Sequence, residues 1–164
     1  MIILGIDPGL ATMGYGVIEV NGDKRRMVQY GTVLTKAGEP IPARLRTIFL
    51  GVNQLMDIYK PEDVAIEELF FSKNITTGIA VGEARGAILA AIATRTENIY
   101  EYTPMQIKQA VTGYGGAEKQ QVQQMVRMLL NMREIAKPDD AADALAVALT
   151  HANSGSMKKM FRIR

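Results

Sequence analysis

The chain has no cysteine, and His151 is its only histidine. Disulfide bonds and thiolate chemistry are therefore excluded, and a single histidine argues against a zinc site and zinc hydrolases. The longest apolar stretches, around 87–93 and 144–149, fall well short of the ~20 residues that a membrane span needs. The first apolar run is broken at Asp7, with no basic region ahead of it, so it does not resemble a signal peptide. We expect a soluble, cytoplasmic protein.

Neither sign of charge is in clear excess, because the net charge over 164 residues is only +2. Two local clusters are basic, at 24–26 and in the tail 158–164, but such runs are usually solvated and do not by themselves indicate a nucleic-acid partner. The length suits a single domain over residues 1–164 with one core. This domain ends in a short basic tail that starts at about residue 154.

The hydrophobic pattern predicts an α/β fold. Three strands at 2–7, 15–20 and 27–35, joined by short turns, indicate an antiparallel meander. An amphipathic helix from residue 41 then leads to a strand at 63–67, parallel to the first. A helix at 76–94, a strand at 98–102 and helices near 104–111, 118–130 and 138–153 follow. The order predicts a mixed five-stranded sheet, three strands antiparallel and then two parallel, flanked by helices.

Four carboxylates stand next to apolar segments. Asp7 and Glu67 each end a strand that reads as buried, and the carboxyl ends of parallel strands are where open α/β sheets bind ligands. Asp140 and Asp143 are three residues apart, on one face of an otherwise uncharged helix. Three of them have a simpler explanation: Asp7 as a turn residue before Pro-Gly, Glu67 as a strand end in water, and Asp140 as a first-turn acid. Asp143 is harder to explain in this way, because it lies one turn into the helix. The pair Asp139 and Asp143 would also share a face, so the pattern leaves that choice open.

If the four acids converge, their repulsion needs an opposing charge. Two charges ~4 to 5 Å apart at an effective dielectric of ~20 repel by roughly 3 to 4 kcal/mol. A few such pairs would cancel most of the ~5 to 15 kcal/mol that keeps a domain folded. Because all the ligands would be oxygen atoms, the sequence favours a hard cation such as Mg²⁺ or Mn²⁺.

Several other features could contact a nucleic acid. Phe70 and Lys73 follow Glu67 in a stretch with no helical or strand period, and an exposed aromatic ring can stack on an unpaired base. Lys108 and Lys119 flank a glycine-rich loop and could hold phosphates. A different interpretation takes the glycines after Asp7 as the phosphate loop of sugar kinases and actin-like ATPases, which are normally more than twice this length.

Taken together, these residues resemble the RuvC-type Holliday junction resolvases of the ribonuclease H-like superfamily. The resemblance spans nearly the whole chain and is carried by Gly5-Ile6-Asp7-Pro8-Gly9, Gly14-Tyr15-Gly16-Val17-Ile18, Ala65-Ile66-Glu67, Lys73-Asn74, Gly82-Glu83-Ala84-Arg85-Gly86, Lys108-Gln109, Ala117-Glu118-Lys119, Gln121-Val122, Met125-Val126 and Asp140-Ala141-Ala142-Asp143-Ala144-Leu145-Ala146. It implies a ribonuclease H-like fold and a homodimeric, Mg²⁺-dependent endonuclease. Such an enzyme makes paired nicks in four-way DNA junctions during homologous recombination and DNA repair.

By this resemblance, two metal ions in each site would be held by Asp7, Glu67, Asp140 and Asp143, which favours Asp140 over Asp139. The resemblance also implies DNA contacts by Phe70, Lys73, Arg85, Lys108 and Lys119. It further implies the branch-migration proteins RuvA and RuvB as partners. The Gly/Ala-rich helix 78–93 is a candidate for the dimer interface or, equally, a core helix. Alternative functions are a less selective metal nuclease and a junction-binding protein without catalysis.

Overall fold

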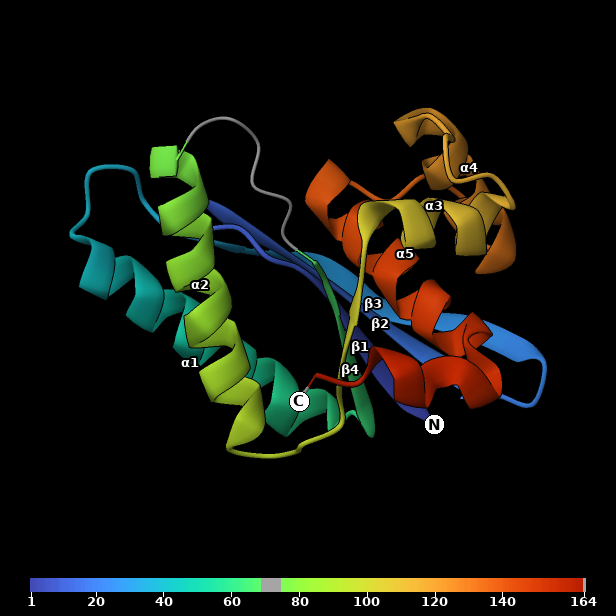
Figure 1. Cartoon of the computed structure of the whole chain (residues 1–164), viewed down its shortest axis with the longest axis horizontal. Coiled ribbons are helices and arrows are strands. Elements are labelled where there is room, and N and C mark those ends of the chain that lie inside the picture. The colour runs from blue at the N-terminus through green and yellow to red at the C-terminus, as the bar shows by residue number, and fades with distance from the viewer. Residues whose placement is uncertain (69–74, 164) are drawn as a thin grey trace.

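The computed structural model describes residues 1–68 and 75–163, and the side chains from residue 78 on in the second range. A five-stranded sheet in the order β3-β2-β1-β4-β5 lies between two layers of helices (Figure 1). The strands are β1 (Ile2–Asp7), β2 (Thr12–Asn21), β3 (Lys24–Leu34), β4 (Asp63–Glu67) and β5 (Ile99–Tyr102). The helices are α1 (Ile41–Tyr59), α2 (Ile75–Ala93), α3 (Pro104–Thr112), α4 (Lys119–Leu129), α5 (Asp139–Asn153) and the 3-10 helix η1 (Gly155–Phe161).

The strand directions confirm the expected sheet. β1 pairs with β2 and β2 with β3 in antiparallel fashion, whereas β1 pairs with β4 and β4 with β5 in parallel. Two strands of the meander are longer than predicted, since β2 begins at Thr12 and β3 at Lys24. Their ends pair Asn21 with Lys24, so the hairpin turn is Gly22-Asp23, and Gly22 adopts the left-handed conformation that this turn requires.

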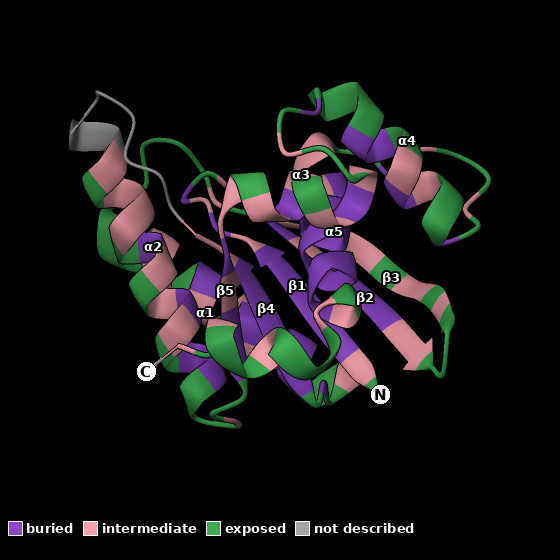
Figure 2. Cartoon of the chain, turned by 45° about the vertical axis from the view of Figure 1, so that its right-hand side comes forward, coloured by how far each residue is buried: buried purple, intermediate pink, exposed green. Residues whose placement is uncertain are grey.

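Alternation along the strands gives the sheet two buried faces. Ile3, Ala65 and Tyr100 pack against α3, α4 and α5, whereas Leu4 and Ile66 pack against α1 and α2. Figure 2 shows that α5 is buried along most of its length between the sheet and the two helices over it. In the described parts of the chain, no helix is both long and apolar enough to span a membrane.

Three glycines let α5 approach the sheet closely. Gly5 lies opposite Gly16 across the β1 and β2 pair, and Gly14 lies opposite Asp7. A Cβ atom added to Gly5 would lie 2.1 Å from the Ala144 carbonyl oxygen, and one added to Gly14 would lie 2.0 Å from the Asp140 carbonyl oxygen. No side chain fits at those distances. Because α5 covers these positions so closely, only glycine can occupy them. Gly14 and Gly16 therefore belong to a strand covered by a helix, which contradicts their interpretation as a phosphate loop.

A buried polar network holds the C-terminal segment against the other end of the sheet. His151 accepts or donates hydrogen bonds at both ring nitrogens, to the Tyr102 hydroxyl at 2.8 Å and to Asp63 at 2.9 Å. Asp63 also forms an ion pair with Lys158 of η1 at 2.7 Å. Part of the basic tail is thus docked on the domain by one of its lysines. His151 lies two turns beyond Asp143 on α5, and both of its ring nitrogens are engaged here, so it is not positioned as a general base for the acidic site.

Candidate active site

The acidic site begins with two strand ends that share one face of the sheet. In β1, Ile3, Gly5 and Asp7 lie on the face of the strand that meets α5, and in β4 the same alternation places Glu67 on that face. The parallel register pairs Ile6 with Ile66. Asp7 and Glu67, one residue further along each strand, are therefore neighbours at the carboxyl edge of the sheet.

The N-terminal turn of α5 supplies the other two acids. The Asp140 backbone lies directly over Gly14, the residue paired with Asp7, so the helix begins above the end of β1. Asp143, one turn further along α5, lines a cleft of about 260 Å³ together with Glu67, Lys108 and Lys119. The structure thus brings all four predicted acids to one edge of the sheet, with two of the predicted lysines beside them.

Burial and mutual repulsion raise the affinity of three of these acids for protons. The pKa of Asp7 rises to about 8 because of burial, followed by the negative charges of Glu67, Asp143 and Asp140. Burial and the charge of Asp143 raise the pKa of Glu67 to about 7. Burial also raises the pKa of Asp143, although Lys119 opposes the rise. Raised pKa values mean that the protein does not by itself compensate the charge that these acids acquire when they lose their protons.

The donor set suits a hard divalent cation, because it consists of carboxylate oxygens whose repulsion such an ion would relieve. Among the described residues, no three Asp, Glu or His side chains converge closely enough to form a complete ligand set as they stand. Instead, Lys119 donates a hydrogen bond to Asp143 Oδ2 at 2.9 Å. A protein ammonium group therefore contacts one of the four acids in this structure.

Asp139, which the sequence pattern could not separate from Asp140, has different surroundings. Its side chain is about half exposed, and it pairs with Lys137 at 3.2 Å and with Lys119 at 3.5 Å. Gln123 of α4 also donates a hydrogen bond to it at 3.1 Å. These partners lower the pKa of Asp139, in the order Lys137, Gln123 and Lys119. Asp139 is a charge-compensated residue at the rim, whereas Asp140 adds its charge to the field at Asp7.

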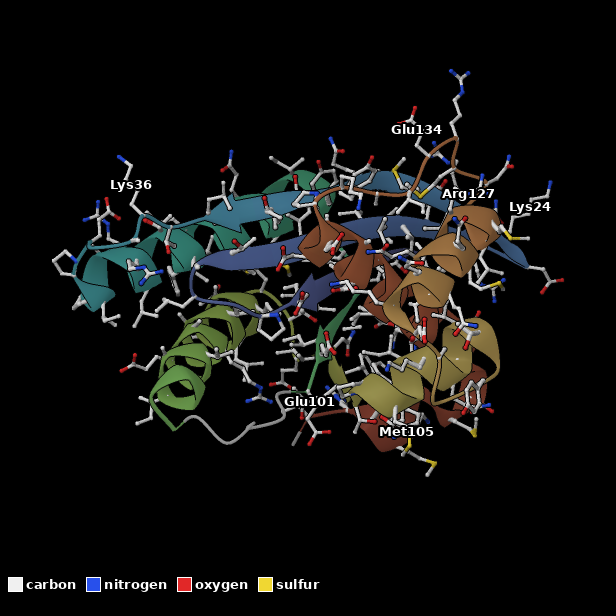
Figure 3. The ribbon with its side chains drawn as sticks, turned by 90° about the horizontal axis from the view of Figure 1, so that it is seen from above. Lys24, Lys36, Glu101, Met105, Arg127 and Glu134 are labelled. Carbon is white, nitrogen blue, oxygen red and sulfur yellow. The ribbon has the colours of Figure 1, made fainter. Side chains whose placement is uncertain are left out.

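The remaining predicted DNA contacts lie elsewhere. Arg85 of α2 forms an ion pair with Glu101 of β5, and both side chains are about three-quarters buried. Glu101 belongs to the strand that leads into α3, near the labelled Met105 (Figure 3). Phe70 and Lys73 lie outside the described residues.

The comparisons with known proteins agree with this geometry. The family model of crossover junction endodeoxyribonuclease RuvC matches residues 3–151 of the chain. This chain belongs to the RuvC family. A crossover junction endodeoxyribonuclease RuvC from Alkaliphilus metalliredigens is 51% identical over 164 residues, covering 100% of both chains. The RuvC of Brevibacillus brevis is 54% identical over 152 residues, 93% of this chain and 92% of that protein.

Solved structures of RuvC proteins have the same fold. Thermus thermophilus RuvC in complex with a Holliday junction substrate is 40% identical, with a TM-score of 0.90 over 96% of each chain. The yeast mitochondrial Holliday junction resolvase Ydc2 has a TM-score of 0.70 over 98% of this chain and 82% of its own. At 16% identity, the yeast protein supports the shared fold only.

Two features of the RuvC-family site were missed from the sequence. One is the pairing of Lys119 with Asp143 and Asp139, which links α4 to α5 across 20 or more residues of chain. The other is Gln123, a polar residue that is buried on α4 because it faces Asp139. A glutamine on the buried face of an otherwise amphipathic helix was the available sequence signal for the second feature.

Proposed function

We propose that this chain cuts four-way DNA junctions by paired nicks, as a divalent-metal-dependent endonuclease in recombination and repair. The observation that carries the proposal is the set of Asp7, Glu67, Asp140 and Asp143 at one sheet edge, where burial and mutual repulsion raise the pKa of Asp7 and Glu67. Membership of the RuvC family makes the chain a DNA endonuclease. The structural similarity to a RuvC solved with a Holliday junction substrate supports a junction as the DNA structure that it cuts.

We assign the binding of Mg²⁺ to the four carboxylates, with two ions in each site and Mn²⁺ as a possible substitute. When bound, such ions activate a water molecule for attack on phosphorus and stabilise the charge on the departing oxygen. The protein contributes three things. The strand ends fix Asp7 and Glu67, the start of α5 brings Asp140 and Asp143 to them, and the deprotonated forms of these acids bind the cations.

Lys108 and Lys119 are the proposed phosphate contacts at the cleft. Both line it together with Glu67 and Asp143, so a phosphate there would meet two ammonium groups beside the acids. A positive rim is needed because bare carboxylates repel the phosphate backbone. We also propose Phe70 as the ring that stacks near the junction centre, and Lys73 and Arg85 as further DNA contacts. For Arg85, contact with DNA would require its ion pair with Glu101 to open or to be shared.

The protein is proposed to act as a homodimer, because one protomer presents one acidic site whereas paired nicks require two related by a two-fold axis. Helix α2 offers a suitable surface. Ala84 and Ile88 are buried against the domain, but Ile79 is 59% exposed and a Cβ atom on Gly82 or Gly86 would meet nothing within 4 Å. A single domain over residues 1–164 would thus pair through α2.

The family resemblance alone supports RuvA and RuvB as partners and the cytoplasm as the location.

Cutting of three substrates tests the junction specificity. A synthetic four-way junction, a linear duplex and an RNA–DNA hybrid are incubated with the protein and Mg²⁺, and the nicks are mapped on every strand. We expect symmetric nicks in two junction strands of like polarity and little cutting of the other substrates. Equal cutting of all three would instead favour a less selective ribonuclease H-like nuclease.

The Asp7→Asn variant separates the nuclease from a junction-binding protein without catalysis. We expect its junction cleavage to fall by about 10²- to 10³-fold, a typical loss when a group central to transition-state stabilisation is removed. Binding should be retained or strengthened, because one negative charge facing the phosphates is lost. Cleavage unchanged by the substitution would show that the acids have no catalytic role.

A further inference from the structure

Lys119 lies between two carboxylates that have different surroundings. Its Nζ atom is 2.9 Å from Asp143 Oδ2 and 3.5 Å from Asp139 Oδ2. Asp143 is one of the four proposed metal ligands and is largely buried, whereas Asp139 is about half exposed. The lysine thus contacts one acid of the proposed metal site and one acid outside it.

This arrangement creates a conflict when a metal ion binds. Asp143 cannot keep its short ion pair with Lys119 and also give the same oxygen to a divalent cation at full strength, because the two cations repel each other. A cation bound to Asp143 therefore weakens the hold of Asp143 on Lys119, and a second acidic partner for the ammonium group becomes favourable. Asp139 Oδ2 is the carboxylate oxygen that already faces it.

The Asp139 carboxyl group is held in place through its second oxygen atom, Oδ1. Its Oδ1 atom accepts hydrogen bonds from Gln123 at 3.1 Å and from Lys137 at 3.2 Å, so those two partners orient the carboxyl group and leave Oδ2 toward Lys119. Gln123 is buried, and α4 carries both Gln123 and Lys119 one turn apart. Helix α4 therefore supplies both Gln123, which orients the Asp139 carboxyl group, and Lys119, which pairs with it.

We propose that Asp139 is a positioning residue that takes over Lys119 when Asp143 binds the metal ion. The proposal rests on the function proposed above. In the metal-free protein Lys119 offsets the charge of Asp143, and in the metal-loaded protein Asp139 keeps the ammonium group beside the cleft, where it can contact a phosphate. Asp139 itself contacts neither metal nor DNA, and its effect on metal binding passes through Lys119.

A double-mutant cycle on metal affinity tests the proposal. Mn²⁺ binding to the full-length protein without DNA is measured from the free-ion EPR signal for the wild type, Asp139→Asn, Lys119→Met and the double variant. Asparagine keeps the shape of the side chain and an oxygen for Gln123 but removes the charge. We expect Asp139→Asn to weaken Mn²⁺ binding by about three- to five-fold when Lys119 is present, the range of an exposed ion pair. In the Lys119→Met background the same change should have less than about a two-fold effect.

If Asp139→Asn changed the Mn²⁺ affinity equally in both backgrounds, Asp139 would act only as a distant negative charge. If it changed the affinity in neither background, Asp139 would not act on the metal. Either result overturns the proposal. Glu134→Gln is the charge-matched control, since this exposed acid points outward from the loop before α5 (Figure 3). It should alter Mn²⁺ affinity by less than about two-fold, because screening weakens distant charges. A larger effect from the control would also overturn the proposal.

Cleavage supplies a second readout. The Asp139→Asn variant should raise the Mg²⁺ midpoint of junction cleavage, and excess Mg²⁺ should restore most of its rate, whereas a merely structural role would lower the rate equally at every Mg²⁺ concentration. If the Mn²⁺ cycle shows the expected coupling but the wild-type protein leaves the junction uncut, the proposed function fails and the assignment of Asp139 stands.

Discussion

Asp7 shows how one buried acid can be costly to the fold and still be retained. Its pKa of about 8 lies well above the usual value of 3.8, so the folded chain without metal holds a proton that the unfolded chain has already lost at neutral pH. Glu67 behaves in the same way with a pKa of about 7. An acid with a raised pKa in the folded state makes the free energy of unfolding fall as pH rises through the window between its two pKa values.

The first prediction concerns the stability of the metal-free protein. Between about pH 4 and pH 8 the wild type should lose stability through Asp7, with an upper bound on the order of 5 kcal/mol at the alkaline end. Asp7→Asn should therefore gain in melting temperature relative to the wild type as pH is raised, when both are measured in EDTA. If the difference in melting temperature between the two proteins stayed constant from pH 4 to pH 8, the pKa of Asp7 would not be raised in the folded state.

The second prediction concerns protons released on metal binding. Because Asp7 and Glu67 are partly protonated near pH 7 and must be deprotonated to bind Mg²⁺, binding should release protons and tighten as pH rises from 6 to 8. Calorimetry in buffers of different ionisation enthalpy measures the release directly. We expect about one to two protons per protein and close to none above pH 9. Metal binding that is independent of pH would contradict the raised pKa values.

Among the elements, α5 depends on the glycines beneath it to bring Asp140 and Asp143 over the ends of the strands. The sequence predicted the strands and helices because the periodicities of 2 and 3.6 are strong in this chain, and it predicted that Asp7 and Glu67 lie at one edge. The sequence did not reveal how closely α5 packs on the sheet, although Gly14 and Gly16 are two residues apart and therefore lie on the same face of the strand, beneath α5. Their role depends on a helix more than 120 residues away, which no local pattern contains. The pairing of Lys119 with Asp143 was inaccessible for the same reason.

The third prediction tests the close packing of α5 on the sheet. Gly14→Ala should destabilise the fold by about 3 kcal/mol and reduce cleavage, because its Cβ atom would lie 2.0 Å from the Asp140 carbonyl oxygen and push the start of α5 off the sheet. Gly86→Ala is the control, measured at protein concentrations where the chain is monomeric because α2 is the proposed dimer face. There the added atom meets open space, so the substitution should stabilise the helix by about 0.5–1 kcal/mol. Chemical denaturation measures both. A neutral Gly14→Ala variant would show that α5 does not press on that glycine.

At the scale of the whole molecule, two helical layers leave one face of α2 exposed. Ile79 is 59% exposed on that face, together with Glu83 and Gly86, while Ala84, Ile88 and Ile92 are buried. The small residues on the exposed face allow a second helix to approach closely. A dimer built this way would place two acidic sites on one two-fold assembly, as a junction with two equivalent strands requires.

The fourth prediction follows from that assembly. Ile79→Glu should weaken dimerisation by at least about ten-fold, because two like charges would be brought together at an apolar interface. Met128→Glu is the matched control, since Met128 of α4 is 63% exposed on the opposite helical layer. Sedimentation velocity over a dilution series measures both. Equal dimerisation of Ile79→Glu and the wild type would exclude this face of α2.

The most direct test of the account is the position of bound metal. A crystal of the full chain grown with Mn²⁺ and examined by anomalous diffraction should show density within about 2.0–2.3 Å of Asp7 and of other members of the set Glu67, Asp140 and Asp143. We also expect Lys119 to have left Asp143 in that crystal. An ion bound only elsewhere, in a protein preparation that cuts junctions in Mn²⁺, would contradict the claim that these four acids form the catalytic metal site.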